Sequence, residues 1–211
     1  MAEEIIEQGY RELADTILEH NPGVDLGRVR AAFELADRAH SGQKRKAGTP
    51  YVTHCVAAAQ ICAEMGLDED SIVAALLHDC IEDTAITHED IARQFGGEVA
   101  DIVEGVTKLT RVQFTSREDE QMENLRKMLM AMAKDIRVIL IKIADRLHNM
   151  RTMEYMVAQK QLEKSLETME IYAPIAHRLG LQKVKWELED LSLKYLDPDG
   201  YREIITYLDS K

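Results

Sequence analysis

The chain has 211 residues, enough for one domain with a sizeable core, and its low aromatic content of 5% with few Gly and Pro favours an all-helical fold. Its net charge of −12 argues against a nucleic-acid-binding protein. No stretch approaches the ~20 apolar residues of a membrane helix and no signal peptide opens the chain, so we expect a cytoplasmic protein without membrane association.

Two helices are predicted over residues 3–19 and 26–39, where apolar side chains recur at helical spacing on either side of an Asn-Pro-Gly turn. The loop that follows, residues 40–54, is rich in Gly, Ser and Pro. It contains the basic run Gln43–Lys46. Three cations in a row are compatible with a solvated loop or with a contact to a phosphate or a nucleotide.

The segment SIVAALLHDCIED, residues 71–83, predicts a single helix with an apolar stripe. At about 100° per residue, His78 shares one side of this helix with three acids, Asp79, Glu82 and Asp83. Burying unpaired charges is costly, so these groups imply a bound ion or a water-filled pocket. The alternative is a structural histidine beside an acidic helix end. The helix before this segment is expected to begin at His54.

Later elements follow the same logic. Thr87 with Asp90 three residues on predicts a capped helix start. Further helices are expected over residues 98–109, 117–133 and 160–209, the last range holding two or three, with a polar segment over residues 110–120. Pro174 is expected to start or kink one of the last helices.

The segment 136–153 predicts a central helix, because it is apolar on two sides. The stripe opposite Asp145 contains Ile136, Leu140, Ile143, Leu147 and Met150. Asn149 and Thr152 share the face of Asp145. A buried aspartate needs a partner, and Lys142 or Arg146 could supply it as a plain salt bridge.

These residues suggest a metal site. Mixed imidazole and carboxylate ligands suit Mn, Fe, Co, Ni or Zn. His78 and Asp79 can reach one ion, and His54 and Asp145 are the candidates from other helices to complete its ligands. Such an ion lowers the pKa of a bound water and polarises a phosphoryl oxygen. The residues placed one turn beyond to accept a proton are Glu82 and Asp83.

Four motifs in order, RKAGTPYVTH, ALLHDCIEDT, VTKLTR and ILIKIADRLHNMRT, together resemble the hydrolase domain of the RelA/SpoT homologue family, over about residues 28–205. The resemblance implies a single all-helical domain of the HD superfamily, of about ten helices, spanning residues 1–211. It also implies a manganese-dependent hydrolase that removes the 3′-pyrophosphate from the alarmones ppGpp and pppGpp, giving GDP or GTP and pyrophosphate in the stringent response.

Site residues carry over motif by motif. The implied metal ligands are His54, His78, Asp79 and Asp145, and the implied water-activating acids are Glu82 and Asp83. The implied nucleotide contacts are Arg45, Lys46, Asn149 and Thr152, with Lys108 and Arg146 as weaker phosphate candidates. Two departures are Cys55, where the family more often has Pro, and Ala47, where Ser is common.

Two other functions are open at this point. The chain could be a non-catalytic domain that binds the alarmone and signals to a synthetase, or an HD phosphohydrolase that acts on another nucleotide such as NADPH. Long family members carry a synthetase domain after the hydrolase. We expect no such domain within these 211 residues, and a parent chain longer than this one could supply it.

Overall fold

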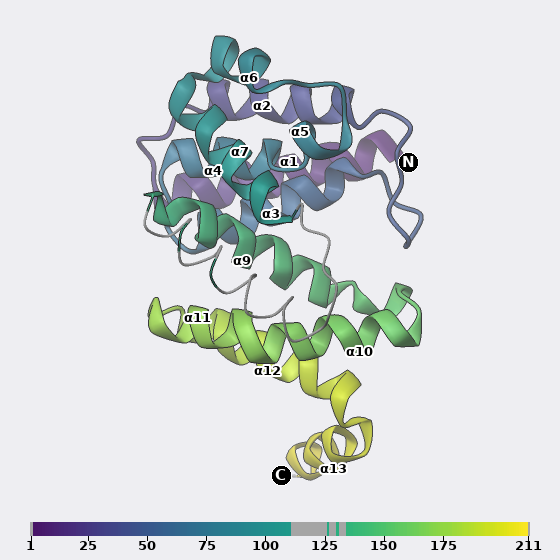
Figure 1. Cartoon of the computed structure of the whole chain (residues 1–211). Coiled ribbons are helices and arrows are strands. Elements are labelled where there is room, and N and C mark those ends of the chain that lie inside the picture. Colours follow the sequence, from purple (N-terminus) through teal and green to yellow (C-terminus); the bar gives the residue numbers. More distant parts are fainter. Residues whose placement is uncertain (1, 111–125, 127–129, 131–133, 211) are drawn as a thin grey trace. The chain divides into compact units, whose positions relative to one another are not determined.

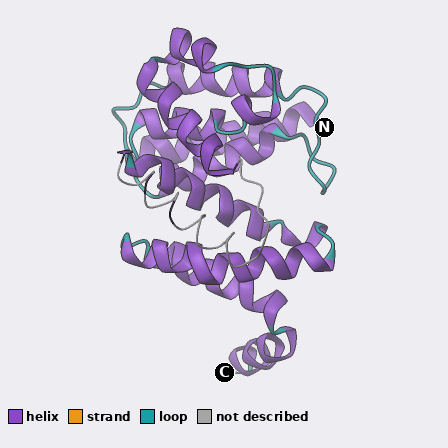
Figure 2. Cartoon of the chain, viewed as in Figure 1, coloured by secondary structure: helices purple, strands orange, loops and turns teal. Residues whose placement is uncertain are grey.

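The computed structural model describes residues 2–110, 126, 130 and 134–210. This part of the chain forms helices and loops without a strand, so the all-helical prediction is confirmed (Figure 2). The expected polar segment 110–120 and most of the expected helix 117–133 lie outside the described residues. Contacts divide the chain into two compact units, Met1–Asp145 and Arg146–Lys211, and the single hydrolase domain stays a prediction.

The first unit is built around two buried helices, α3 and α4 (Figure 1). Helix α4 is buried at every position from Ser71 to Leu77. The elements of this unit are α1 (Ala2–His20), α2 (Leu26–Ala39), α3 (Val52–Glu64), α4 (Glu69–Leu77), α5 (Cys80–Asp83), α6 (His88–Phe95), α7 (Gly97–Thr110) and most of α9 (Ile136–Arg151). Helix α3 packs on α1 and α4, and α4 also packs on α2 and α7.

Side-chain caps fix where several of these helices begin. Asp68 accepts a hydrogen bond from the Ser71 amide at the start of α4, at 2.9 Å. The predicted capping box of α6 is confirmed, because Thr87 and Asp90 each accept a bond from the other's backbone amide. These local contacts satisfy amides that lack a partner inside the helix.

The structure corrects the prediction of one helix over residues 71–83. Helix α4 ends at Leu77, His78 and Asp79 form a turn, and the short α5 follows. The carbonyl of Ala75, which a continuing α-helix would offer to the amide of Asp79, accepts a hydrogen bond of 2.7 Å from His78 Nδ1. The break therefore lies at the two residues expected to bind a metal.

The apolar stripe predicted for α9 is correct only in part. Ile143, Leu147 and Met150 are buried, whereas Ile136 is 45% exposed. Ile136 is the first residue of the helix, where an apolar side chain has fewer neighbours than in the helix centre.

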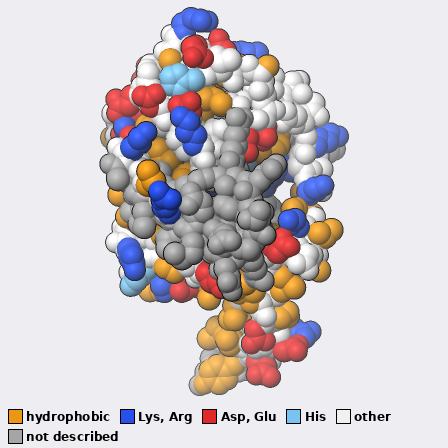
Figure 3. Space-filling model, in the orientation of Figure 1, with side chains coloured by type: hydrophobic (Ala, Val, Ile, Leu, Met, Phe, Trp, Pro, Cys, Tyr) orange, Lys and Arg blue, Asp and Glu red, His pale blue; other side chains and the backbone are white. Residues whose placement is uncertain are grey.

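The second unit contains η1 (Met153–Tyr155), α10 (Ala158–Glu167), η2 (Thr168–Tyr172), α11 (Ala173–Arg178), α12 (Gln182–Leu196) and α13 (Pro198–Asp209). Element η2 is a π-helical turn, and Pro174 lies in the first turn of α11, as expected of a residue that begins a helix. Residues 158–209 thus form four α-helices rather than two or three. Helix α13 exposes the apolar side chains of Ile204, Tyr207 and Leu208. Figure 3 shows apolar side chains on the surface of the C-terminal part of the chain.

None of the helices in the described ranges combines the length and the apolar character needed to cross a bilayer.

Candidate metal centre

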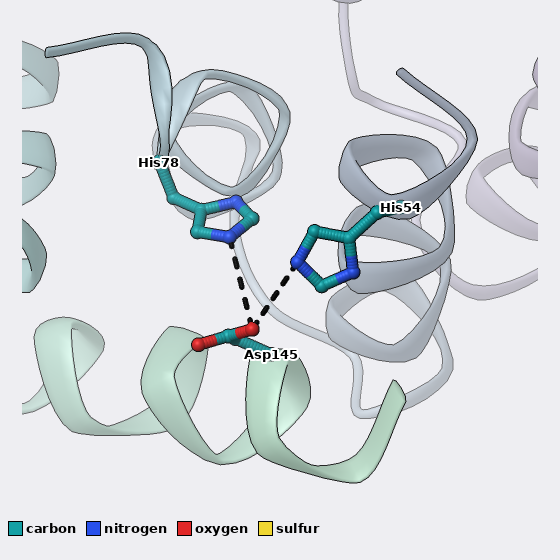
Figure 4. Close-up of side chains that lie close together, drawn as sticks. All are labelled: His54, His78 and Asp145. Carbon is teal, nitrogen blue, oxygen red and sulfur yellow. Dashed lines mark ion pairs between the residues drawn. The ribbon is translucent and has the colours of Figure 1, made fainter. Parts of the chain in front are cut away.

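Three buried side chains from three helical segments converge in the first unit (Figure 4). His54 lies in the first turn of α3, His78 follows the last residue of α4, and Asp145 lies on α9. One potential ligand atom from each of them lies within 4.8 Å of the other two. Asp145 Oδ1 is 3.2 Å from His54 Nε2 and 3.9 Å from His78 Nε2.

Asp79, the fourth predicted ligand, approaches both imidazoles. Its Oδ2 lies 3.1 Å from His78 Nε2 and 3.6 Å from His54 Nε2. The turn that follows α4 brings this carboxylate back toward the ring of the preceding residue. Two nitrogens and two carboxylates therefore face one another, the donor set that a divalent transition metal takes from proteins.

The orientation of His78 fits a metal ligand. Because a carbonyl can only accept, Nδ1 carries the proton donated to Ala75 O, and Nε2 faces the cluster. Nε2 is buried and lies in ion-pair range of two carboxylate oxygens, at 3.1 and 3.9 Å, but neither contact within the described chain has the geometry of a hydrogen bond. A buried polar atom is rarely left this way, and a cation among these groups would satisfy it.

Asp145 uses its two oxygens differently. Lys142, one turn earlier on α9, places its Nζ 2.7 Å from Oδ2. The other oxygen, Oδ1, faces the two imidazoles. From the sequence, a salt bridge with Lys142 and a metal-ligand role were alternatives for Asp145, but its two oxygens allow both.

Ionisation of the cluster also suits a cation. Burial raises the pKa of Asp145, but Lys142 and the two histidines outweigh it and hold that pKa well below its usual range. Burial likewise raises the pKa of Asp79, and His78 lowers it overall. Burial lowers the pKa of His78, but the two aspartates raise it to about 9. Both carboxylates are thus ionised at neutral pH, and a metal would displace the proton of His78.

His54 differs from His78. Burial lowers its pKa, and the opposing effect of Asp145 is too weak to restore it. A neutral imidazole is the form that binds a metal.

The predicted water-activating acids lie directly after the cluster, on α5. Asp83 is exposed and Glu82 is half-buried. A residue that sequence reasoning missed, Tyr51, connects Asp83 to the cluster: its hydroxyl is 2.8 Å from Asp79 Oδ2 and 3.1 Å from Asp83 Oδ2. Burial and the charge of Asp79 raise the pKa of Tyr51, so the phenol stays a donor.

The basic loop is folded back on itself. Lys44 and Pro50 form an isolated β-bridge, and the Arg45 amide donates to Thr49 O at 2.9 Å. Arg45 is half-buried, with its guanidinium 5.7 Å from the centre of the Tyr51 ring, whereas Lys46 is exposed. The loop thus holds one predicted nucleotide-binding cation beside the residue that contacts the acids.

The remaining predicted contacts come from α7, from the end of α9 and from the residue that follows it. Asn149 and Thr152 are half-buried residues of the second unit. Arg146, also in that unit, is 3.0 Å from Glu167 and lies over the Tyr172 ring at 4.2 Å. Lys108 is 70% exposed on α7 and pairs with Glu104. Their roles in binding a phosphate or a nucleotide stay predictions.

Comparison with known proteins agrees with this geometry. The HD domain family matches residues 32–182. The chain is 49% identical over 195 residues to "Bifunctional (p)ppGpp synthase/hydrolase SpoT" of Escherichia coli K12, which covers 92% of this chain and 28% of that protein. It is 52% identical over 187 residues to "Probable GTP pyrophosphokinase" of Mycobacterium leprae, covering 89% of this chain and 24% of the relative.

One solved structure is similar to this chain over nearly the whole length of the solved chain. It is described as "A metazoan ortholog of SpoT hydrolyzes ppGpp and plays a role in starvation responses", with 28% identity and a TM-score of 0.56 over 80% of this chain and 91% of that one. The curated relatives are much longer, and this chain spans about a quarter of their length. The family match and these identities show that the chain belongs to the HD domain family, among the relatives of SpoT, as its motifs predicted.

Proposed function

We propose that the chain is a metal-dependent hydrolase that removes the 3′-pyrophosphate from ppGpp and pppGpp, releasing GDP or GTP and pyrophosphate. The observation that carries this proposal is the convergence of two imidazoles and two carboxylates in a chain of the HD domain family. The names of the long relatives include both a synthase and a hydrolase activity, so those names alone do not choose between them.

Two features favour hydrolysis. The four predicted ligands and both predicted acids are present, and the ligands lie close together. The solved relative, whose description states that it hydrolyzes ppGpp, is similar over 91% of its length. The solved chain therefore lies almost entirely within the region that it shares with this chain.

His54, His78, Asp79 and Asp145 would hold the metal. We propose manganese, although the donor set suits other divalent transition metals. When bound, the cation supplies Lewis acidity, which lowers the pKa of water and polarises a phosphoryl oxygen. The protein supplies the orientation: Ala75 O fixes the ring of His78, and Lys142 fixes the carboxylate of Asp145.

The acid pair would move the proton. Glu82 and Asp83 follow the ligands by one turn, and we assign them the acceptance of a proton from the attacking water. Arg45 and Lys46 would bind the phosphates or the guanine base, since a chain with net charge −12 needs local cations for an anionic ligand. Asn149, Thr152, Lys108 and Arg146 are further candidates for contacts to the nucleotide.

The test is release of pyrophosphate from ppGpp by the purified chain with Mn²⁺ present. Turnover that chelation abolishes and that Glu82→Gln reduces would support the proposal. Binding of ppGpp without turnover would contradict it and favour a regulatory domain. Faster turnover of NADPH or a nucleoside triphosphate in the same panel would assign the site to another nucleotide.

A further inference from the structure

Tyr51 lies where the candidate metal centre, the acid pair and the basic loop meet. It is the residue immediately before α3, three positions before His54. Its phenolic oxygen contacts two carboxylates from different positions, Asp79 Oδ2 at 2.8 Å and Asp83 Oδ2 at 3.1 Å. The oxygen of Asp79 that it contacts is the same oxygen that faces the two imidazoles.

The ring of Tyr51 packs against His40 and against Arg45 of the basic loop. His40, buried at 2% exposure, stacks on it with the centroids 4.6 Å apart and the planes at 20°. The guanidinium of Arg45 lies 5.7 Å from its centre. The Tyr51 amide also donates to Gln43 O at 3.1 Å, so the backbone before α3 is tied to the loop.

A second connection joins the loop to the acid pair. Gln43 Nε2 donates to the carbonyl of Asp83 at 3.1 Å, and Gln43 Oε1 lies 2.9 Å from His40 Nδ1. Asp83 is therefore contacted twice: Tyr51 contacts its carboxylate, and Gln43 contacts its backbone carbonyl. Asp83 is exposed, and an exposed carboxylate without such contacts would sample several rotamers.

We propose that Tyr51 is a positioning residue that orients the ligating oxygen of Asp79 and keeps Asp83 next to it. The hydroxyl has one proton, which it shares between two carboxylates that would otherwise repel each other. Groups that hydrogen-bond to a metal ligand fix its orientation, and their loss typically weakens metal binding about 10–100-fold. This inference rests on the proposed metal site.

The first measurement uses the metal alone. Tyr51→Phe removes the hydroxyl and keeps the ring against His40 and Arg45. Titration of the metal-free protein with Mn²⁺ is expected to give a dissociation constant about 10-fold higher than that of the wild type. A Mn²⁺ affinity equal to that of the wild type would overturn the proposal.

The matched control is Tyr10→Phe. Tyr10 also has a ring against an aromatic side chain, Phe33, and beneath an arginine, and its hydroxyl donates to Leu26 O at 3.3 Å. It lies on α1, and in the described part of the chain its aromatic, cation and hydrogen-bond partners are Phe33, Arg30 and Leu26, none of which is a proposed ligand. Its variant should bind Mn²⁺ as the wild type does. Weakening of the same size in both variants would show a general effect of losing a hydroxyl and would overturn the specific role of Tyr51.

A kinetic measurement separates the effect of Tyr51 on Asp83 from its effect on Asp79. At saturating Mn²⁺, Tyr51→Phe should lower kcat for ppGpp and leave KM nearly unchanged, because its hydroxyl contacts Asp79 and Asp83, to which we assign roles in chemistry rather than in nucleotide binding. In an Asp83→Asn background the same substitution should lower kcat much less, while Mn²⁺ affinity still falls. An undiminished loss of kcat in that background would contradict positioning through Asp83.

The two readouts keep the proposals distinguishable. If the wild type binds Mn²⁺ and releases no pyrophosphate from ppGpp, the proposed function fails. The comparison of Mn²⁺ affinity between wild type, Tyr51→Phe and Tyr10→Phe still decides whether Tyr51 orients a ligand.

Discussion

Replacing Asp145 by Asn tests whether this carboxylate both pairs with Lys142 and binds a metal. The substitution keeps the shape of the side chain and removes its charge. Asp145 is 6% exposed, and its Oδ2 is 2.7 Å from Lys142 Nζ, itself on a side chain that is 12% exposed. Removing one partner of a buried ion pair costs about 3–5 kcal/mol, and the partial exposure of Lys142 places the expected loss near about 3 kcal/mol.

The assay is thermal unfolding with and without metal. For a chain of this size, about 3 kcal/mol corresponds to a fall of about 6–12 °C in the midpoint of the metal-free protein. Mn²⁺ at about 100 times the dissociation constant of the wild type stabilises that protein by about 2.7 kcal/mol. If Asp145→Asn weakens binding about 100-fold, the same concentration stabilises the variant by only about 0.4 kcal/mol.

A second substitution separates the two roles. Lys142→Met combined with Asp145→Asn removes both charges, so it should recover much of the lost stability in the absence of metal. It should not recover the stabilisation by Mn²⁺, because the ligand is still missing. A metal-free Asp145→Asn variant that melts with the wild type, or one that Mn²⁺ stabilises as fully as the wild type, would refute the reasoning.

Three further outcomes are expected. Glu82→Gln should lower kcat for pyrophosphate release by about 10²–10⁴ while Mn²⁺ affinity stays near that of the wild type; a parallel loss of affinity would instead make Glu82 a ligand. Gly105→Ala should destabilise the protein by about 1–3 kcal/mol, since a Cβ there would lie 2.8 Å from Val138 Cγ2; in denaturant melts, adding Val138→Ala should recover part of the loss. The hydrogen bond from Arg137 lowers the pKa of Asp135 in the folded protein. The Asp135 carboxylate therefore stabilises the fold at a pH above its unfolded pKa of about 3.9, and this stabilisation is lost as the pH falls through its lower folded pKa. Asp135→Asn should therefore be less stable than the wild type at pH 6, with the difference narrowing below about pH 4 in acid titrations of unfolding.

The helical fold could be predicted because its signals are local. The capping box at Thr87 and Asp90 lies within four residues, and the paired ligands His78 and Asp79 are neighbours in sequence. Asp145 could be selected because a buried aspartate on an apolar helix needs a partner, and His54 because a metal site needs a further imidazole from another helix. The structure brings both to the cluster. The role of these residues in binding a metal stays a prediction.

Other features depend on contacts that periodicity does not contain. At the break between α4 and α5 a histidine ring donates to a backbone carbonyl that a continuing helix would use, whereas the apolar pattern of residues 71–83 is continuous. Tyr51 lies inside the motif RKAGTPYVTH, but its importance comes from its hydroxyl, which contacts two aspartates that are 28 and 32 residues later in the chain. The exposure of Ile136 likewise depends on what surrounds the end of a helix, which its own pattern does not specify.

The acceptor that orients His78 is part of the main chain, and this affects how the site can change over generations. A side-chain acceptor can be lost by one codon change, whereas the carbonyl of Ala75 persists whatever amino acid occupies that position. A substitution at residue 75 changes the side chain that packs there but keeps the carbonyl that accepts the hydrogen bond from His78. Lineages that abandon this chemistry are therefore expected to do so through replacement of the imidazoles and carboxylates, with the backbone that aims His78 left intact.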